Sequence, residues 1–567
     1  MRGRRGAWIS TAIYAAVIWL FFVRPLHGRF GTAMLGTALF PHDAILAAGI
    51  LEWCRRAIAS PALHVFDWTA GYPLTNTLAN VENLLGWQPL YALLRALGAT
   101  VTFSYNTLIV GSFLLSAAGA RLLARRLGAN EEGACLAGVV FAFVPFHLAH
   151  VIHLQTMAVC WAPIAFLCLD RYLVEGRALD LAGTAASAVL CFLSGLYIGL
   201  FLAIALPLYA GAILLASRAP LDRRRLAALA GAGLASAAAL WPVVDHYLRW
   251  AHAFGYSHPI GVMTRFSIEL LALAKVPFWL AVWSGSGYPG ITTHESAAFP
   301  GIVATVLVIL AFRGGDRDKG VTRALLFLAA TFFALSLGPR LLWRENTPVP
   351  HTAWLPLPGQ LLGLVSAVRW SMRALLLTFL FGAVLAGLGF TQVTRRLSPR
   401  WRQAAAVAAG LLMLIEYRPI DYYAGNSHDV PDPMALSDAY PVLAAEADRG
   451  AIVELPVADA GGYRTPMLVR STYGSAGHLR RVVAIHGQTV PPLTAALLED
   501  AERLPDPAAA EHLRKIGCTR VVMHRTWMRG RHIDDMIARM RQAGMPVMWE
   551  SLETVIFSLT EPPSPAR

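Results

Sequence analysis

Long apolar runs recur along most of this chain, and polar residues gather between them. The first run extends from Ala7 to about Val23, and others follow from about Thr102 through Tyr417. A helix of about 20 apolar residues crosses a bilayer core of roughly 30 Å. The pattern therefore predicts eleven membrane-spanning helices, near residues 7 to 25, 103 to 123, 134 to 149, 155 to 173, 179 to 194, 197 to 217, 226 to 245, 299 to 313, 324 to 338, 374 to 392 and 403 to 418.

Composition supports a membrane protein. Apolar residues make up 56% of the 567 positions, charged residues only 15%, and the mean hydropathy is +0.50. Soluble domains carry about 25% charged residues. The first run ends in Arg24-Pro25 without a small-residue cleavage pattern, so it predicts an uncleaved first helix rather than a signal peptide. The six cysteines show no paired metal spacing, which predicts neither a disulfide framework nor a zinc site.

Basic residues set the expected orientation. They precede the first span or follow the second, sixth, eighth and tenth, at Arg2, Arg4, Arg5, Arg121, Arg125, Arg126, Arg218, Arg223 to Arg225, Arg313, Arg317, Lys319, Arg323, Arg395, Arg396, Arg400 and Arg402. The positive-inside rule makes that side cytoplasmic. The N-terminus is then inside and the C-terminus outside, and the net charge of +13 reflects topology rather than a nucleic-acid partner.

The chain divides into two expected domains. Residues 1–419 form a transmembrane domain with long outer loops near 26–102, 246–298 and 339–373. In residues 420–567, strand-like runs near 452–455, 520–523 and 554–557 alternate with helical patterns near 462–473, 491–504, 507–516 and 531–543. We expect an α-helical polytopic membrane protein with a small extracytoplasmic α/β domain at its C-terminus.

The first outer loop carries the leading candidate for chemistry. Asp43 stands just beyond the first apolar run, where a carboxylate can meet water at the membrane surface. Apolar positions with tryptophan, tyrosine and terminal arginines predict interfacial helices at 44–56 and 84–95. Asp43 is then either a reactive carboxylate or a cap for a helix beginning at Ala44, and the two roles are compatible.

A set of short motifs runs through the expected membrane part. The motifs are His42-Asp43-Ala44-Ile45-Leu46, Phe66-Asp67, Gly71-Tyr72-Pro73, Thr77 to Glu82, Tyr105-Asn106, Phe141 to Gln155, Trp161-Ala162-Pro163 and Val368 to Arg373. Together they resemble bacterial polytopic glycosyltransferases of the GT-C class. The tail from Glu454-Leu455-Pro456 onward is similar to the tail of the same group.

The resemblance implies a transferase of cell-envelope glycan biosynthesis. Such an enzyme moves a sugar from a polyprenyl-phosphate donor to a glycan, lipid or protein acceptor outside the bacterial cytoplasmic (inner) membrane, with inversion. A carboxylate on the first outer loop is the expected general base of the class, and Asp43 matches that place. Such a base takes the acceptor's proton as the sugar leaves its phosphate.

Other polar residues of the same loop and the next are candidates for supporting roles. His42 could orient Asp43, contact the donor phosphate or sit in interfacial water. Glu82 is a second candidate catalytic acid, an acceptor-binding residue or else a helix cap, in a segment whose flanking asparagines make it too polar for a core. His150 and His153 match the family pattern, and their spacing of three could bring both to one phosphate or metal.

The donor phosphate needs cations near the membrane surface. Arg369 and Arg373, four residues apart, would share a helix face before the tenth span, as phosphate ligands or as contacts to lipid headgroups. Glu295, at the end of the second long outer loop, is a candidate acceptor contact or a helix cap.

In one respect the chain departs from better-known GT-C enzymes. Several of them place a second acidic residue on the second outer loop, but no acid stands between Ala142 and Ala158 here. Metal dependence is therefore open, since Asp43 with histidines could still hold a divalent ion. Two other classes also stay open: a polytopic transporter or lipid flippase, and a non-catalytic envelope-assembly protein. The sequence identifies neither the sugar nor the acceptor.

Overall fold

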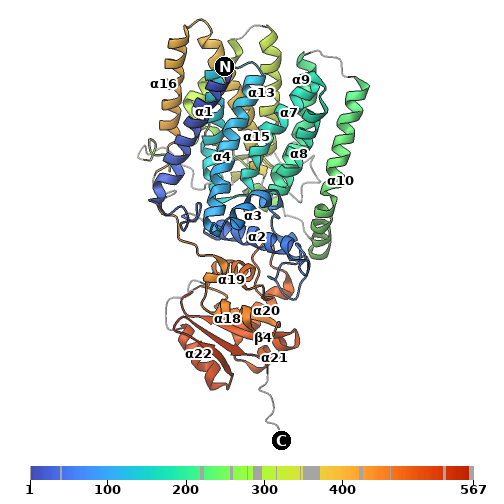
Figure 1. The fold of residues 1–567 in the computed structure, drawn as a ribbon, viewed down its shortest axis with the longest axis vertical. Coiled ribbons are helices and arrows are strands. Elements are labelled where there is room, and N and C mark those ends of the chain that lie inside the picture. Colours follow the sequence, from blue (N-terminus) through green and yellow to red (C-terminus); the bar gives the residue numbers. More distant parts are fainter. Residues whose placement is uncertain are drawn as a thin grey trace. The chain divides into compact units, whose positions relative to one another are not determined.

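The structure is a computed structural model, and it describes residues 2–38, 41–217, 222–255, 260–277, 279–284, 297–313, 316–344, 347–348, 371–420, 425–459, 462–527 and 532–560. The chain forms two compact units (Figure 1). The first comprises Met1–Gly28, Thr107–Val244 and Tyr256–Ser427, and the second Arg29–Asn106, Asp245–Gly255 and His428–Arg567. Each unit thus combines segments that are far apart in the sequence.

Helices occupy all eleven predicted positions of the membrane part. They are α1 (Arg2–Ile18) with its π-helical extension (Trp19–Val23), α4 (Val101–Arg126), α5 (Glu131–Phe143) with α6 (Pro145–Ala149), α7 (Ala162–Glu175), α8 (Ala178–Ser194), α9 (Leu196–Ser217), α10 (Arg223–Phe254), α12 (Ile302–Leu310), α13 (Asp316–Ser336), α15 (Leu375–Thr394) and α16 (Pro399–Tyr417), with the short α11 (Ile260–Arg265) between them. Among the described residues, eight helices are long and apolar enough to cross a membrane, while Ala178–Ser194 and Ile302–Arg313 are shorter. The protein is a multi-pass membrane protein, and the number of crossings and their orientation remain predictions.

Helix α15 is the packing centre of the first unit. It is almost entirely buried and contacts α5, α12 and α13. A Cβ atom on Gly387 would lie 2.7 Å from the carbonyl oxygen of Gly133, so α5 and α15 approach each other through two glycines. Small residues allow such close backbone contacts between membrane helices, where dispersion forces drive association.

Prolines account for the interruptions in the region from 134 to 173. Helix α5 ends at Phe143, Val144 takes an extended conformation (φ −54°, ψ 139°), and Pro145 begins α6. Pro163 lies in the first turn of α7. Proline is tolerated in a first helical turn because the amide hydrogen it lacks would have no partner there.

The second unit contains a four-stranded sheet with the order β3-β4-β6-β5. Strands β3 (Ala451–Leu455) and β4 (Cys518–His524) are parallel, and β6 (Thr554–Ser558) is antiparallel to both β4 and β5 (Val547–Glu550). The accompanying helices are α18 (Ala439–Ala445), α19 (Thr465–His478), α20 (Pro492–Arg503), α21 (Pro507–Lys515) and α22 (His532–Gln542). The predicted α/β fold of the C-terminal part is confirmed, with β5 and α18 as additions.

The segment between α2 and α3 adds directly to this sheet. Ala70 and Ile452 both form parallel bridges with Val482. The amide of Val482 donates to the carbonyl of Thr69 at 2.8 Å, and the amide of Tyr72 donates to the carbonyl of Val482 at 2.9 Å. The first long loop and the C-terminal part therefore fold as one unit. The domain boundary expected at residue 420 did not anticipate this shared fold, and the boundary stays a prediction.

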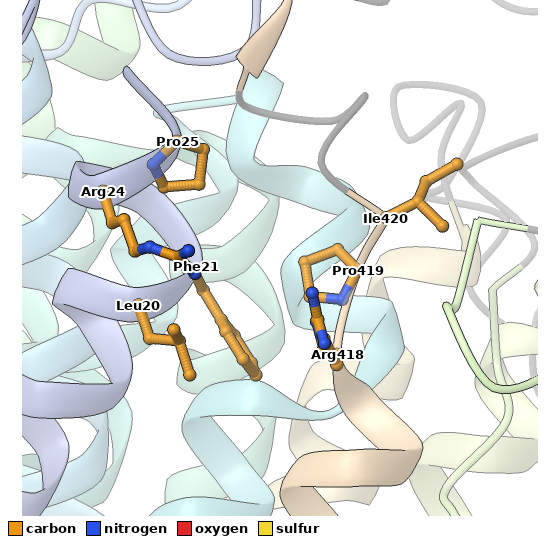
Figure 2. Close-up of a pocket in the computed structure, with 7 residues that line it drawn as sticks. All are labelled: Leu20, Phe21, Arg24, Pro25, Arg418, Pro419 and Ile420. Carbon is orange, nitrogen blue, oxygen red and sulfur yellow. The ribbon is translucent and has the colours of Figure 1, made fainter. Parts of the chain in front are cut away.

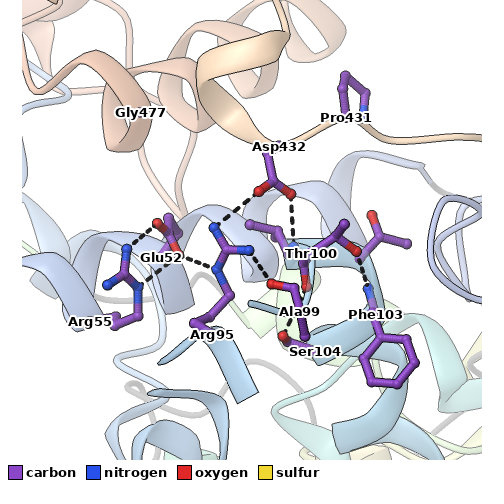
Figure 3. A network of polar contacts seen from close by, with 12 residues as sticks. Glu52, Arg55, Arg95, Ala99, Thr100, Phe103, Ser104, Pro431, Asp432 and Gly477 are labelled. Atoms are coloured by element: carbon purple, nitrogen blue, oxygen red, sulfur yellow. Dashed lines mark hydrogen bonds and ion pairs between the residues drawn. The ribbon is translucent and has the colours of Figure 1, made fainter. Parts of the chain in front are cut away.

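A buried ion network fixes α2 (Pro41–Ala59) and α3 (Gln88–Ala96) in this unit (Figure 3). The Glu52 side chain is fully buried and pairs with Arg55 at 2.6 Å, Arg56 at 3.1 Å and Arg95 at 3.3 Å. Arg95 also pairs with Asp432 at 3.0 Å. The helices predicted at 44–56 and 84–95 are confirmed, but the terminal arginines of the first bind a buried carboxylate as well as reaching toward the surface.

Candidate functional site

Asp43 lies in the first turn of α2, which begins at Pro41 rather than at Ala44. The carboxylate is half-buried. The expected role as a cap of a helix starting at Ala44 is therefore wrong in its position, because Asp43 is inside the helix. An acidic group in a first turn is still stabilised by the helix dipole, whose positive end lies there.

Side chains from several segments of the second unit act electrostatically on His42, the neighbour of Asp43, and on His486. Burial lowers the pKa of His42, the charge of Arg470 lowers it further, and Asp43 and Asp459 oppose the shift. Burial likewise lowers the pKa of His486, with Asp43 opposing the shift and His42 adding to it. Both imidazoles are therefore neutral near pH 7, and each can donate one hydrogen bond and accept another.

Tyr105 belongs to the same unit as Asp43. Its side chain is fully buried in the first turns of α4, within electrostatic range of the Asp43 carboxylate. Its neighbour Asn106 holds the chain that leads toward α2, since its side chain donates to the carbonyl oxygens of Phe30 at 2.8 Å and Ala33 at 2.9 Å. Asn106, part of the pair Tyr105-Asn106 that carried some of the resemblance, thus anchors residues 30–35.

Glu82 lies in the same unit as Asp43, and its segment is buried. Glu82 is 9% exposed, and Asn80 and Asn83 are each 1% exposed. The Asn80 side chain hydrogen-bonds to the Thr489 backbone. It accepts from the Thr489 amide at 3.1 Å and donates to the Thr489 carbonyl at 2.8 Å. The expectation that this segment is too polar for a core was wrong because the partners come from the distant C-terminal part. The catalytic role of Glu82 remains a prediction.

The predicted histidine pair belongs to the first unit. His150 and His153 are buried, with ring centroids 5.7 Å apart, and the Nδ1 atom of His150 lies 2.7 Å from the carbonyl oxygen of Phe146. His147 stacks on Phe113 with a centroid distance of 4.7 Å. The spacing of three therefore does bring His150 and His153 together, and their role at a phosphate remains a prediction.

Arg373 is also in the first unit and is only 3% exposed, at the start of α15. This burial argues against a simple contact with lipid headgroups, because such an arginine keeps its guanidinium in water. Arg369 and Glu295 lie outside the described residues.

A small surface pocket of the first unit contains two further arginines (Figure 2). It is lined by Leu20, Phe21, Arg24, Pro25, Arg418, Pro419 and Ile420. Guanidinium groups beside apolar side chains suit a lipid phosphate and the chain attached to it. No sequence pattern pairs Arg24 with Arg418, because they stand at opposite ends of the membrane part.

The described residues offer no obvious metal site. Within them, no group of three or more histidine, cysteine, aspartate or glutamate side chains is arranged to hold an ion. Asp43 and the neutral histidines His42 and His486 are chemically suitable ligands, but they do not form such a group. Metal dependence therefore remains open.

Sequence reasoning missed Arg470 and His486 and named no site residue in the C-terminal part. Arg470 is one of many arginines in amphipathic helices, and a lone histidine before a glycine has no distinctive pattern. To find these two residues, one would have to know that residues 69–72 pair with residues 482–484. No local sequence pattern predicts that pairing.

Comparison with known proteins places the fold. The chain resembles the arabinofuranosyltransferase AftD from Mycobacteria with a TM-score of 0.60 and 15% identity, over 99% of this chain and 40% of that one. The chain has a GT-C-like fold. This chain spans less than half the length of AftD, and the likeness concerns the fold alone.

Two more distant likenesses are to ArnT from Cupriavidus metallidurans. The apo form has a TM-score of 0.48 and 14% identity over 98% of each chain, and the form bound to undecaprenyl phosphate has a TM-score of 0.46 and 12% identity over 97% of each chain. The sequence matches no protein-family model and no curated protein sequence.

Proposed function

We propose that this protein is a membrane glycosyltransferase that moves a sugar from a polyprenyl-phosphate donor to an acceptor outside the cytoplasmic membrane, with Asp43 as the general base. The observation that carries the proposal is the position of Asp43: a half-buried carboxylate beside two neutral imidazoles, in a chain with a GT-C-like fold. Fold alone does not determine function, so the proposal depends on the residues of the site.

The reaction needs one proton acceptor and one stabilised leaving group. The acceptor oxygen forms a bond to the anomeric carbon while the bond from that carbon to the phosphate oxygen breaks, which inverts the configuration. The hydroxyl proton passes to the Asp43 carboxylate, and polyprenyl phosphate leaves with its electron pair. A neutral His42 can hold the carboxylate by hydrogen bonding without neutralising its charge.

Cationic side chains would stabilise the departing phosphate. Arg373 is the cationic candidate within the described part of the first unit, and His150 and His153, which match the family pattern, are candidates for hydrogen bonds to the phosphate. A guanidinium fork matches the geometry of phosphate oxygens. One of the ArnT structures is bound to undecaprenyl phosphate, and a lipid of that type is our proposed carrier.

Replacement of Asp43 by asparagine tests the base. Asparagine keeps the size of the side chain but cannot accept the proton, so we expect transfer to fall by about 10²- to 10⁴-fold. The assay follows labelled sugar from polyprenyl-phosphate arabinofuranose and hexose donors into acceptor material, with the full-length protein in bacterial membranes. Arabinofuranose is included because AftD is an arabinofuranosyltransferase.

Asp67→Asn is the matched control. Asp67 is an exposed carboxylate of the same loop whose Oδ1 atom accepts the Asn76 amide at 2.7 Å, a contact that asparagine can keep. It should transfer like the wild type. Full transfer by D43N would remove Asp43 as the base. Protein-dependent movement of the donor lipid without any transfer would instead favour a flippase.

A further inference from the structure

Arg470, on α19, lies within electrostatic range of His42, the neighbour of Asp43. The side chain is half-buried, and its guanidinium carbon lies 5.9 Å from the ring centroid of Trp527. Within the part of the chain that the structure describes, no carboxylate pairs with it. A guanidinium that loses water without gaining an anion is unfavourable, so this position is suited to an anion that arrives with a ligand.

His486 is held on the same framework. Its backbone amide donates to the Thr472 hydroxyl of α19 at 3.1 Å. The neighbouring backbone is tied to the first loop, since the Gly71 amide donates to the Ala484 carbonyl at 3.1 Å and the Gln488 amide donates to the Asn80 carbonyl at 3.0 Å. The backbone at His486 is therefore fixed, and its imidazole lies within electrostatic range of Asp43 and His42.

Close packing of α19 on α2 fixes Arg470 relative to His42. A Cβ atom on Gly49 of α2 would lie 3.3 Å from the Tyr473 ring and 3.4 Å from the Tyr473 Cα atom. The Tyr473 hydroxyl in turn donates to the Pro431 carbonyl at 2.8 Å. A glycine contact of this kind leaves little freedom between the two helices, so the charged groups are arranged before any ligand binds.

We propose that Arg470 and His486 form the acceptor subsite of the Asp43 site, and that the acceptor carries an anionic group, a phosphate or a carboxylate, near the hydroxyl that receives the sugar. This inference rests on the proposed function. Arg470 binds the anion, because its planar donors suit either group. His486 hydrogen-bonds the acceptor and places the reacting hydroxyl at Asp43. The C-terminal part thus selects the acceptor.

Chemical modification tests the subsite without any transfer assay. The full-length protein in nanodiscs is treated with phenylglyoxal, and modification of Arg470 is measured by peptide mass spectrometry with inorganic phosphate, glucuronate or neutral glucose present. We expect an anionic probe, but not glucose, to protect Arg470. Protection by phosphate alone indicates a phosphate-bearing acceptor, and protection by glucuronate alone a carboxylate-bearing one. Equal modification with all three probes would overturn the anionic subsite.

Arg481 is the internal control for this experiment. Its guanidinium carbon lies 5.6 Å from the ring centroid of Tyr72, an arrangement like that of Arg470 over Trp527, but the side chain is exposed. Its modification should not respond to the probes. In the His486→Gln variant, protection of Arg470 should weaken if both residues bind one ligand.

Kinetics separate this inference from the proposed function. Loss of a hydrogen bond to a charged group costs about 1.5 to 3 kcal/mol, so R470Q should raise the acceptor KM by about ten- to a hundredfold. The donor KM of R470Q should stay at the wild-type value, and so should both KM values of R481Q. A raised donor KM would move Arg470 to the donor phosphate and refute the subsite. If D43N keeps full transfer, the proposed function fails, whatever the probes show.

Discussion

Single ionisable groups of the second unit differ in how burial and partners set their charge. Burial alone would keep Glu52 protonated, but the hydrogen bonds and charges of Arg55, Arg95 and Arg56 outweigh it and hold the pKa of Glu52 below its ordinary value. Burial acts the other way on His478 and lowers its pKa to about 4. The buried Glu52 carboxylate is thus charged where the buried His478 imidazole is neutral.

Replacement of Glu52 by glutamine should strongly destabilise the second unit. The change leaves three arginines facing a neutral group in a buried network, and breaking a buried ion pair costs about 3 to 5 kcal/mol. The measurement is thermal unfolding of the full-length protein in nanodiscs. The control is Glu502→Gln, because Glu502 pairs with Arg464 at the surface and exposed pairs contribute about 0 to 1 kcal/mol.

The stability of the same two variants should depend differently on pH. The folded pKa of Glu52 is depressed, so its stabilisation is present above the ordinary glutamate pKa of about 4.3 and is lost as pH falls through the folded value. Wild-type protein and E502Q should therefore lose stability on acidification more steeply than E52Q. Equal slopes in all three would contradict the charged network.

The pKa of His42 predicts the pH range in which acid weakens transfer. Its pKa is lowered from an ordinary value of about 6.5, so it stays neutral to a lower pH than a solvent-exposed histidine. Protonation would place a new positive charge beside Asp43 and weaken the base. We expect the part of the acid decline due to His42 to lie below pH 6.5 and to disappear in H42Q. A decline centred above pH 6.5, unchanged in H42Q, would refute this role.

Sequence position singled out Asp43 and His42 as candidates, because they stand just beyond the first membrane-length apolar run, and their roles stay predictions. Sequence position did not single out Arg470 or His486. Their neighbourhood depends on a backbone pairing between two distant segments, and neither residue type is unusual on a helix or in a loop. The proximity of His150 and His153 followed from spacing alone, since helical periodicity is a local property.

At the scale of elements, apolar runs predicted the helices because the length of a span is set by the bilayer. What they could not show is which helices touch. The contact of α5 with α15 depends on Gly133 and Gly387, two ordinary glycines among the many in the chain, whose meaning appears only when the two backbones are seen together. The edge strand β5 was missed because its residues are mostly exposed and do not alternate.

Replacement of Gly387 by alanine should destabilise the first unit. The added methyl would lie 2.7 Å from a backbone oxygen of Gly133, which cannot rotate away as a side chain can, so α5 and α15 must separate. Overpacking of this kind costs about 1 to 3 kcal/mol. Thermal unfolding in nanodiscs provides the measurement.

Gly382→Ala is the matched control, on the same helix. A Cβ atom on Gly382 would meet nothing within 4 Å. Alanine there should be neutral or slightly stabilising, because it favours the helix. Equal destabilisation by the two variants would mean that α15 responds to helix propensity rather than to the contact with α5.

At the scale of the whole chain, composition predicts a membrane domain followed by a small C-terminal domain. The structure groups Arg29–Asn106 with His428–Arg567 in one compact unit. The sequence change near residue 420 is real, but composition describes solvent and lipid preference and says nothing about which distant backbones pair. The sheet extension at Ala70 and Val482 is the element that joins them.

Cleavage between the membrane part and the C-terminal part tests this union. A protease site inserted between residues 420 and 425 cuts the covalent link, yet the fragment from residue 425 onward should remain with the membranes through a high-salt wash. The retaining contacts include the backbone pairing of 69–72 with 482–484, the hydrogen bond of 2.6 Å from the Tyr72 hydroxyl to the Ile516 carbonyl, and the packing of α19 on α2.

Side-chain variants distinguish specific pairing from general adhesion to the membrane. Asn80→Ala with Tyr72→Phe removes three hydrogen bonds to Thr489 and one to Ile516, so the cleaved fragment should be released more readily. Asn130→Ala removes a cap of α5 in the first unit, a hydrogen bond of 2.7 Å, and should leave retention unchanged. Release of the wild-type fragment by salt alone would show that charge, rather than the shared sheet, holds the C-terminal part in place.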